Sequence, residues 1–240
     1  MKNKRKGFAG WSILFLGLTL GVALFSWVGS IYGIGHVQSL LSAEGVRWWM
    51  GNVMSNYLQT PALGVVLVLM MGLGVVVQSG LWNAMKRFFQ PGTLLSRKER
   101  RALMFGLGVL SVYALLIVVS ILLPWNIAQG VIGGWLHSPL FKGLVYVFSL
   151  GIGLSGLVYG YASDTFLRFS DVFEAMSLLV ARYASFFVML FFLAQFFASI
   201  TYTRMDVCLG ISPEFLSLVS QLCSYIPLFL WKCNCKCVNA

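Results

Sequence analysis

The chain has 240 residues, of which 59% are hydrophobic and only 10% are charged. Soluble domains carry about 25% charged residues, so this composition excludes a water-soluble globule and predicts a surface covered largely by lipid. The net charge of +10 does not indicate nucleic-acid binding, because the basic residues form short clusters between apolar runs, as membrane-topology signals do.

Apolar segments along the chain approach or exceed the roughly 20 helical residues that cross a bilayer. They predict an all-α, polytopic membrane protein with five transmembrane helices and a marginal sixth, in a single domain over residues 1–240. The predicted spans are residues 8–32, 61–82, 97–123, 139–162, 183–201 and 215–231. The last is marginal because it is short and contains Ser217, Ser220, Gln221, Ser224 and Pro227.

Two amphipathic segments between the spans predict short helices on the membrane surface. The first covers residues 39–57 and combines charged residues with Trp48 and Trp49. The second covers residues 163–182, where Phe166, Phe169, Phe173 and Met176 recur at three- and four-residue spacing. In addition, Ser96 and Glu99 have the spacing of a capping box, which predicts a helix start there.

The basic residues predict that both termini face the cytoplasm. With the N-terminus inside, the clusters before the first span, in the 86–101 loop, at 168–182 and in the tail all lie on one side. Only Arg47, Lys142 and Arg204 lie on the other side, as the positive-inside rule requires.

All five cysteines lie near the C-terminus, and the tail 232–240 is rich in them. The run Cys233-x-Cys235-x-Cys237 lacks the two-residue spacing of common zinc sites. A reduced cytoplasmic tail is the favoured interpretation, with lipidation and metal binding as alternatives. His36 and His137 have no acidic or cysteine partner nearby in sequence, so they are interpreted as surface residues and no metal site is predicted.

A few polar residues are candidates for a substrate or ion pathway. Gln195 lies within the fifth span, where a polar group needs a partner, so it either contacts a solute or ion or bonds a neighbouring helix. Asp164 follows the fourth span, near Asp171 and Glu174, and these acids either couple a cation or are solvated and capping. Gln78 and Ser79 either line a cavity or end a helix.

Glycines four residues apart allow close packing of membrane helices. Two such pairs are Gly17 with Gly21 and Gly156 with Gly160. We predict helix packing for them, with a flexible helix around a pathway as the alternative. The sequence has no phosphate-binding loop, metalloprotease His pair or triad spacing, so we predict neither an enzyme nor a bound cofactor.

Two stretches resemble the p-aminobenzoyl-glutamate transporter (AbgT) family. The first includes Ser26-Trp27-Val28-Gly29, Leu40 to Trp48, Pro61 to Val68, Gly72 to Val75 and Ser79-Gly80-Leu81. The second includes Leu95 to Leu103, Leu123-Pro124, Ser138-Pro139-Leu140, Tyr159-Gly160, Asp171-Val172 and Phe191 to Phe196. Together they cover roughly residues 10–203.

The sequence departs from the family pattern in two places. Between the two stretches the family has further helices and a re-entrant hairpin, and residues 82–95 are too few to supply them. After Thr203 the family continues with a second hairpin, whereas Arg204-Met205-Asp206 and the cysteine-rich end follow here. Relative to the family, this chain is therefore a shortened version.

The resemblance implies a secondary transporter, or a fragment of one, in the bacterial cytoplasmic (inner) membrane. The implied solute is p-aminobenzoyl-glutamate or a related folate-pathway compound, coupled to a Na⁺ or H⁺ gradient, and the implied assembly is a homodimer in the lipid bilayer. The alternative hypothesis is a shortened membrane protein without transport activity, in a structural or partner role.

Overall fold

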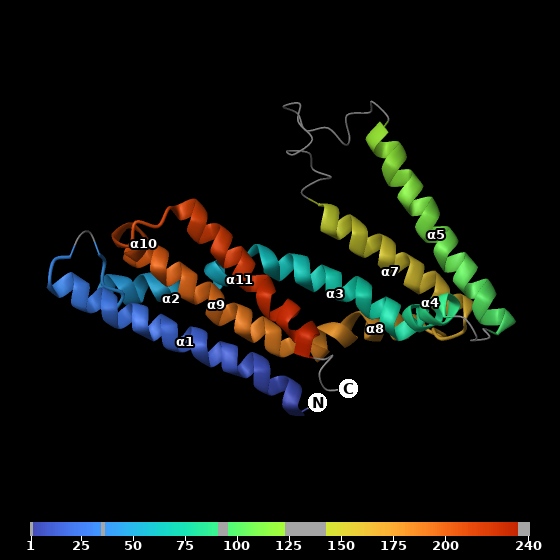
Figure 1. Cartoon of the computed structure of the whole chain (residues 1–240), viewed down its shortest axis with the longest axis horizontal. Coiled ribbons are helices and arrows are strands. Elements are labelled where there is room, and N and C mark those ends of the chain that lie inside the picture. The colour runs from blue at the N-terminus through green and yellow to red at the C-terminus, as the bar shows by residue number, and fades with distance from the viewer. Residues whose placement is uncertain (1, 35–36, 91–95, 123–142, 235–240) are drawn as a thin grey trace. The chain divides into compact units, whose positions relative to one another are not determined.

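The computed structural model describes residues 2–34, 37–90, 96–122 and 143–234 (Figure 1). Every regular element in these ranges is a helix, and none is a strand. The helices are α1 (Lys2–Ile31), α2 (Ala43–Leu58), α3 (Pro61–Ser79), α4 (Leu81–Phe89), α5 (Arg97–Leu122), α7 (Leu144–Ala162), α8 (Phe169–Arg182), α9 (Ala184–Thr203), α10 (Met205–Cys208) and α11 (Pro213–Asn234).

Within these ranges, five segments are long and apolar enough to cross a membrane, which confirms the predicted polytopic helical fold. They are Phe8–Ile31, Ala43–Ser79, Arg97–Ser120, Leu144–Ala162 and Ala184–Thr203. The predicted sixth segment forms α11, which is not among the five, so its crossing stays a prediction. Large side chains such as Ile13, Leu20 and Phe25 are exposed on α1, as lipid contact requires.

Local chemistry sets several helix boundaries. Ser42 begins α2 by accepting a hydrogen bond at its Oγ from the backbone N–H of Gly45, at 3.0 Å. The second predicted span extends to residue 82, but α3 ends at Ser79 because Gly80 has a left-handed backbone, with φ of 81°, and α4 then begins at Leu81.

The chain forms two compact units, each described here by itself. The first unit combines Met1–Gly64 with Tyr183–Ala240, and the second is Val65–Arg182. The prediction of a single transmembrane domain concerns how these units combine and stays a prediction.

In the first unit, α9 is the central helix. Its residues Phe186, Met189, Leu190 and Leu193 are at most 1% exposed. The helix α1 runs parallel to it, with the Phe8 ring edge-on to Phe186 and the centroids of Phe15 and Phe196 6.0 Å apart. Burial of large aromatic and aliphatic side chains along this seam is the main stabilising contribution.

The helix α2 packs lengthwise and antiparallel on α9. Near one end of this seam Trp48 stacks on Tyr202, with ring centroids 4.1 Å apart. Near the other end the Tyr57 hydroxyl donates to the carbonyl of Phe187 at 3.2 Å. The helix predicted at 39–57 therefore exists. It runs along the length of α9, whereas a helix on the membrane surface would lie across the end of α9.

In the second unit, α5 and α7 form an antiparallel pair joined by side-chain hydrogen bonds to backbone carbonyls. Ser155 donates to Gly106 at 2.8 Å, and Tyr113 donates to Val147 at 3.0 Å. Ser149 on α7 also donates to the carbonyl of Val68 on α3, at 2.6 Å. Such bonds hold helices together where lipid offers no hydrogen-bonding partner.

Candidate functional site

A cavity of about 380 Å³ lies in the first unit, between α2, α9, α10 and α11. It follows α9 from Leu193, at the middle of the helix, to Thr201, near its C-terminal end. The cavity is lined by Asn56, Gln59, Thr60, Leu193, Ala194, Phe197, Ala198, Thr201, Asp206, Pro213, Leu216, Ser217, Ser220, Gln221 and Ser224. Its volume falls within the roughly 300–1,000 Å³ typical of small-molecule sites.

Helical spacing explains how α9 and α11 form this cavity. On α11, Ser217, Ser220, Gln221 and Ser224 recur at three- and four-residue spacing and line the cavity. The opposite face of α11 carries Phe215, Leu218 and Leu222, which are 57–63% exposed. On α9 the lining residues include Ala194 and Ala198, which recur after four residues and leave the space open. The helix α11 is therefore amphipathic, with its polar face turned toward α9.

The hydroxyl groups of the lining present acceptors rather than donors. Each of Thr60, Thr201, Ser217, Ser220 and Ser224 donates its proton to a carbonyl of its own chain three or four residues earlier. These bonds are 2.8–3.2 Å long. A hydroxyl that has donated its proton keeps oxygen lone pairs for a ligand, so the lining is rich in acceptors.

Two lining side chains have buried polar atoms without a hydrogen-bond partner in the described part of the chain. Asp206 is 7% exposed, and its Oδ1 has no partner. Asn56, on α2, has a buried Nδ2 without a partner. Leaving such atoms unpaired costs about 1–3 kcal/mol each. Both residues also line the cavity, which makes it the candidate binding site of the first unit.

Among the described residues, no lysine or arginine lines the cavity, and the Asp206 carboxylate is the one charged side chain of its lining. Arg204 is exposed and adopts a left-handed backbone, with φ of 55°, between α9 and α10. Five lining residues are exposed, namely Gln59, Thr201, Pro213, Ser217 and Gln221. The cavity is therefore electronegative and open on one side.

Gln195 lies on α9 beside this cavity but is not part of its lining. It is 3% exposed, and its Nε2 donates to the carbonyl of Val53 on α2 at 2.8 Å. This is the interhelical bond that the sequence analysis weighed against a solute contact. Its Oε1 is buried and has no partner among the described residues, so a role in a pathway stays a prediction.

The other predicted pathway residues, Gln78, Ser79 and Asp164, belong to the second unit. Gln78 is exposed at the end of α3. Ser79 is buried and donates to the carbonyl of Val76 at 3.1 Å. Asp164 forms an ion pair with Lys98 and has a left-handed backbone, with φ of 57°. Its side chain is 60% exposed, so it lies outside any enclosed site.

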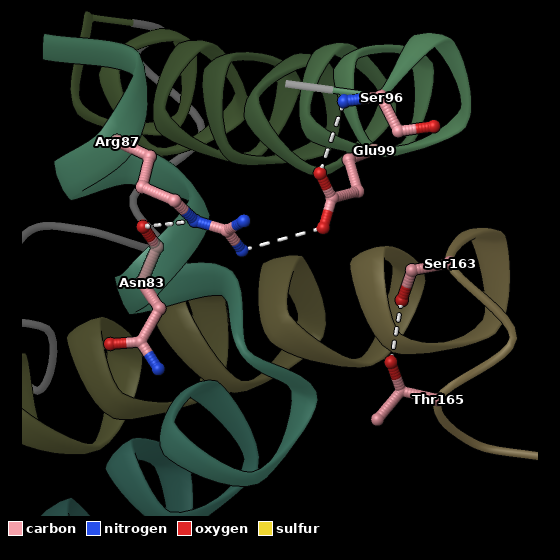
Figure 2. Close-up of polar contacts among 6 residues, drawn as sticks. All are labelled: Asn83, Arg87, Ser96, Glu99, Ser163 and Thr165. Carbon is pink, nitrogen blue, oxygen red and sulfur yellow. Dashed lines mark hydrogen bonds and ion pairs between the residues drawn. The ribbon is translucent and has the colours of Figure 1, made fainter. Parts of the chain in front are cut away.

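Figure 2 shows further polar contacts at this end of the second unit. Glu99 accepts from the backbone N–H of Ser96 at 3.2 Å, which is half of the predicted capping box, and pairs with Arg87 at 3.3 Å. Ser163 and Thr165 share a hydrogen bond of 2.8 Å after α7. These contacts fix the ends of α4, α5 and α7.

Asp171 caps the start of α8. Its Oδ2 accepts from the backbone N–H groups of Arg168 and Leu167, each at 2.9 Å. These bonds stabilise the carboxylate and lower the pKa of Asp171 below its ordinary value. Asp171 therefore has a structural role as the cap of α8, as the capping interpretation predicted.

The two predicted glycine pairs have different surroundings. A Cβ at Gly156 would lie 3.1 Å from backbone atoms of Val76 on α3, and one at Gly160 would overlap the Phe166 ring. A Cβ at Gly17 or Gly21 would have no atom within 4 Å. The glycine pair on α7 thus lies against close neighbours, whereas the pair on α1 has none within the described chain.

Several predicted features lie outside what the structure describes. These are His36, His137, Cys235 and Cys237. Among the described residues, no group of three or more His, Cys, Asp or Glu side chains could hold a metal ion.

Sequence reasoning did not single out Asp206 or Asn56. The available signal was the polar stripe of Ser217, Ser220, Gln221 and Ser224, whose period matches one helical face. It was interpreted as weakness of the sixth span. The position of Asp206 four residues before the turn at Gly210 gave no indication that its carboxylate would be buried.

A family model for the AbgT transporter family matches residues 12–90 and 90–230. The chain belongs to this family. The match breaks at residue 90, within the stretch where the sequence analysis places the missing family segment, and it continues through α11 to residue 230. Because AbgT members are transporters, the prediction that the chain is not an enzyme is confirmed.

Two solved structures share this fold. The Alcanivorax borkumensis YdaH transporter has a TM-score of 0.71 at 18% identity, covering 83% of this chain and 72% of its own. Neisseria gonorrhoeae MtrF, described with a class of antimetabolite efflux pumps, has a TM-score of 0.75 at 16% identity, covering 92% and 80%. No curated protein matches the sequence. This AbgT chain is thus an integral membrane protein in contact with the lipid bilayer.

Proposed function

We propose that this AbgT chain is a secondary transporter for p-aminobenzoyl-glutamate or a related aryl-amide of the folate pathway, driven by a Na⁺ or H⁺ gradient. The observation that carries the proposal is the polar cavity between α2, α9, α10 and α11. Its volume of about 380 Å³ suits a small solute. Membrane transporters place polar and irregular backbone elements where they line such cavities.

The lining supports one orientation of the solute. The Phe197 ring and the small side chains of Ala194 and Ala198 give an apolar wall for an aromatic ring. The Asp206 carboxylate accepts a hydrogen bond from an aryl amine, whereas it repels the two glutamate carboxylates. The aryl-amine end therefore enters first, and the glutamate end stays at the exposed rim near Gln59 and Gln221.

We also propose the bacterial cytoplasmic membrane as the location, with both termini cytoplasmic, and a homodimer as the assembly. The one-sided placement of the basic clusters supports the orientation, and the family resemblance supports the location and the homodimer. Labelling of single cysteines introduced at exposed positions tests the orientation. With the native cysteines replaced by serine, a cysteine at Leu209, before α11, should react with an impermeant thiol reagent outside intact cells, and one at Phe89 should not.

The test of function is uptake of labelled p-aminobenzoyl-glutamate into proteoliposomes of the purified chain. Separate arms impose a Na⁺ gradient, a proton gradient, both and neither. Gradient-driven flux above that of protein-free liposomes supports the proposal and identifies the coupling ion. Efflux from preloaded vesicles is measured in parallel, because direction is not fixed by the lining. A folded, monodisperse protein without flux in any arm contradicts the proposal.

A further inference from the structure

We propose that the same cavity is a binding site for small organic cations, in which Asp206 is the counter-ion of a protonated amine. The expected ligand has an ammonium group attached to a compact apolar or aromatic body. This goes beyond the proposed aryl-amide transport, because it assigns a second ligand class by charge.

The first argument is the negative charge of the lining. Asp206 lines the cavity and is only 7% exposed, and its Oδ1 is buried without a hydrogen-bond partner in the described part of the chain. Because the lining contains no lysine or arginine, and Asp206 forms no ion pair within the described chain, its charge is not neutralised there. An unpaired carboxylate at low exposure attracts a cation strongly, since the surroundings screen the charge less than water does.

The second argument is the supply of acceptors. The hydroxyls of Ser217, Ser220 and Ser224 on α11 and of Thr201 on α9 direct their protons to helix carbonyls. Their oxygens can therefore accept the N–H groups of an ammonium ion, which carries only donors. An anionic group inside the cavity would meet these lone pairs and a carboxylate, whereas the amide donors of Gln59 and Gln221 lie at the exposed rim.

The third argument is size, which separates an organic cation from a bare metal ion. A hard metal ion needs oxygen ligands within about 2.6 Å around it. The cavity has about 380 Å³, whereas a water molecule occupies roughly 30 Å³ of liquid. A ligand with an apolar body fills this space and contacts Leu193, Phe197 and Leu216, and the Phe197 ring adds a cation–π attraction.

The experiment measures binding of benzylamine, which is protonated at pH 7, to the full chain purified in detergent, by calorimetry. Benzoate and benzyl alcohol have similar bodies with a negative and no charge, and serve as ligand controls. Sodium chloride and potassium chloride are compared at equal ionic strength. The variants are Asp206→Asn, which removes the charge at nearly constant shape, and Glu214→Gln, an exposed acid outside the lining.

We expect benzylamine to bind the wild type and Glu214→Gln equally, and Asp206→Asn to weaken its affinity by roughly tenfold or more. Asn56→Asp adds a second carboxylate to the lining and should tighten benzylamine binding, a gain that misfolding cannot produce. Equal binding to Asp206→Asn, or benzoate binding as tight as benzylamine, would overturn the proposal. A sodium-specific stabilisation without benzylamine binding would assign the cavity to an inorganic ion and also overturn it.

These outcomes are separable from those of the transport test. Benzylamine binding without p-aminobenzoyl-glutamate flux would leave the cation site standing and contradict the proposed transport. Flux that benzylamine and Asp206→Asn leave unchanged would support transport and contradict the cation site.

Discussion

Gln195 on α9 donates a hydrogen bond from its Nε2 to the backbone carbonyl of Val53 on α2, 2.8 Å away. The two residues are 142 positions apart in the chain, so this bond joins the two parts of the sequence that make up the first unit. Its donor is 3% exposed, in a segment where hydrocarbon offers no alternative partner.

Gln195→Ala should therefore lower the free energy of unfolding by about 2 kcal/mol or more, because it removes the bond and leaves a void. Gln195→Leu keeps most of the volume and also removes the unpaired Oε1, so it should cost only about 1 kcal/mol. Unfolding of both variants in detergent by denaturant titration measures the difference. Equal destabilisation by the two substitutions would contradict a mainly structural role.

Gly156→Ala should destabilise the second unit by about 1–3 kcal/mol, because the new Cβ would press against the Val76 backbone at 3.1 Å and α3 would have to shift. Gly108→Ala on α5 is the matched control, since a Cβ there meets no atom within 4 Å. The control should be neutral or stabilising by up to about 1 kcal/mol, owing to the better helix propensity of alanine. Thermal unfolding of both variants distinguishes them, and equal melting temperatures would contradict the packing shown here.

The Asp171 cap predicts a pH dependence for α8. The two backbone hydrogen bonds hold the folded-state pKa of Asp171 below its ordinary value, so its stabilising contribution is fully present above that ordinary value. The contribution is lost as the pH falls below it, through the lower folded-state pKa. Hydrogen exchange at the α8 amides should therefore accelerate in this acidic range, and Asp171→Asn should reduce the effect. An unchanged pH profile in the variant would contradict the cap.

Asp164 tests whether backbone conformation or charge dominates at the end of α7. Asp164→Asn keeps a residue type that tolerates the left-handed region, with φ of 57°. It removes only an exposed ion pair with Lys98, so it should cost about 0.5 kcal/mol or less. Asp164→Val should cost about 1–2 kcal/mol more, because a β-branched residue is strained there. Stability measurements at low and high salt separate the two effects.

The helical class and most of the spans were predictable, because runs such as 183–201 are continuous and apolar and match α9 closely. The position of α2 was not. Its mixed composition fits the membrane surface, and only the tertiary contacts of Trp48, Val53 and Tyr57 with α9 place it lengthwise along that helix.

The glycine pairs show the same limit of sequence reasoning. Gly17 with Gly21 and Gly156 with Gly160 have identical spacing, yet only the second pair has close neighbours in the described chain. For the cavity, the serine stripe of α11 was visible in the sequence, but the burial of Asp206 depends on the turn after α9. Spacing along one helix does not specify which partner helix it meets.

Initial-rate uptake of p-aminobenzoyl-glutamate by a cavity-filling variant tests most directly whether the cavity is the solute site. Ala198→Leu adds three carbons to a side chain in the lining on α9. Val188→Leu adds one carbon at a residue of the same helix that is 53% exposed and outside the lining. With both variants folded, gradient-driven uptake should persist in Val188→Leu and fall to the level of protein-free liposomes in Ala198→Leu. Undiminished uptake in Ala198→Leu would contradict the assignment of the cavity as the solute site.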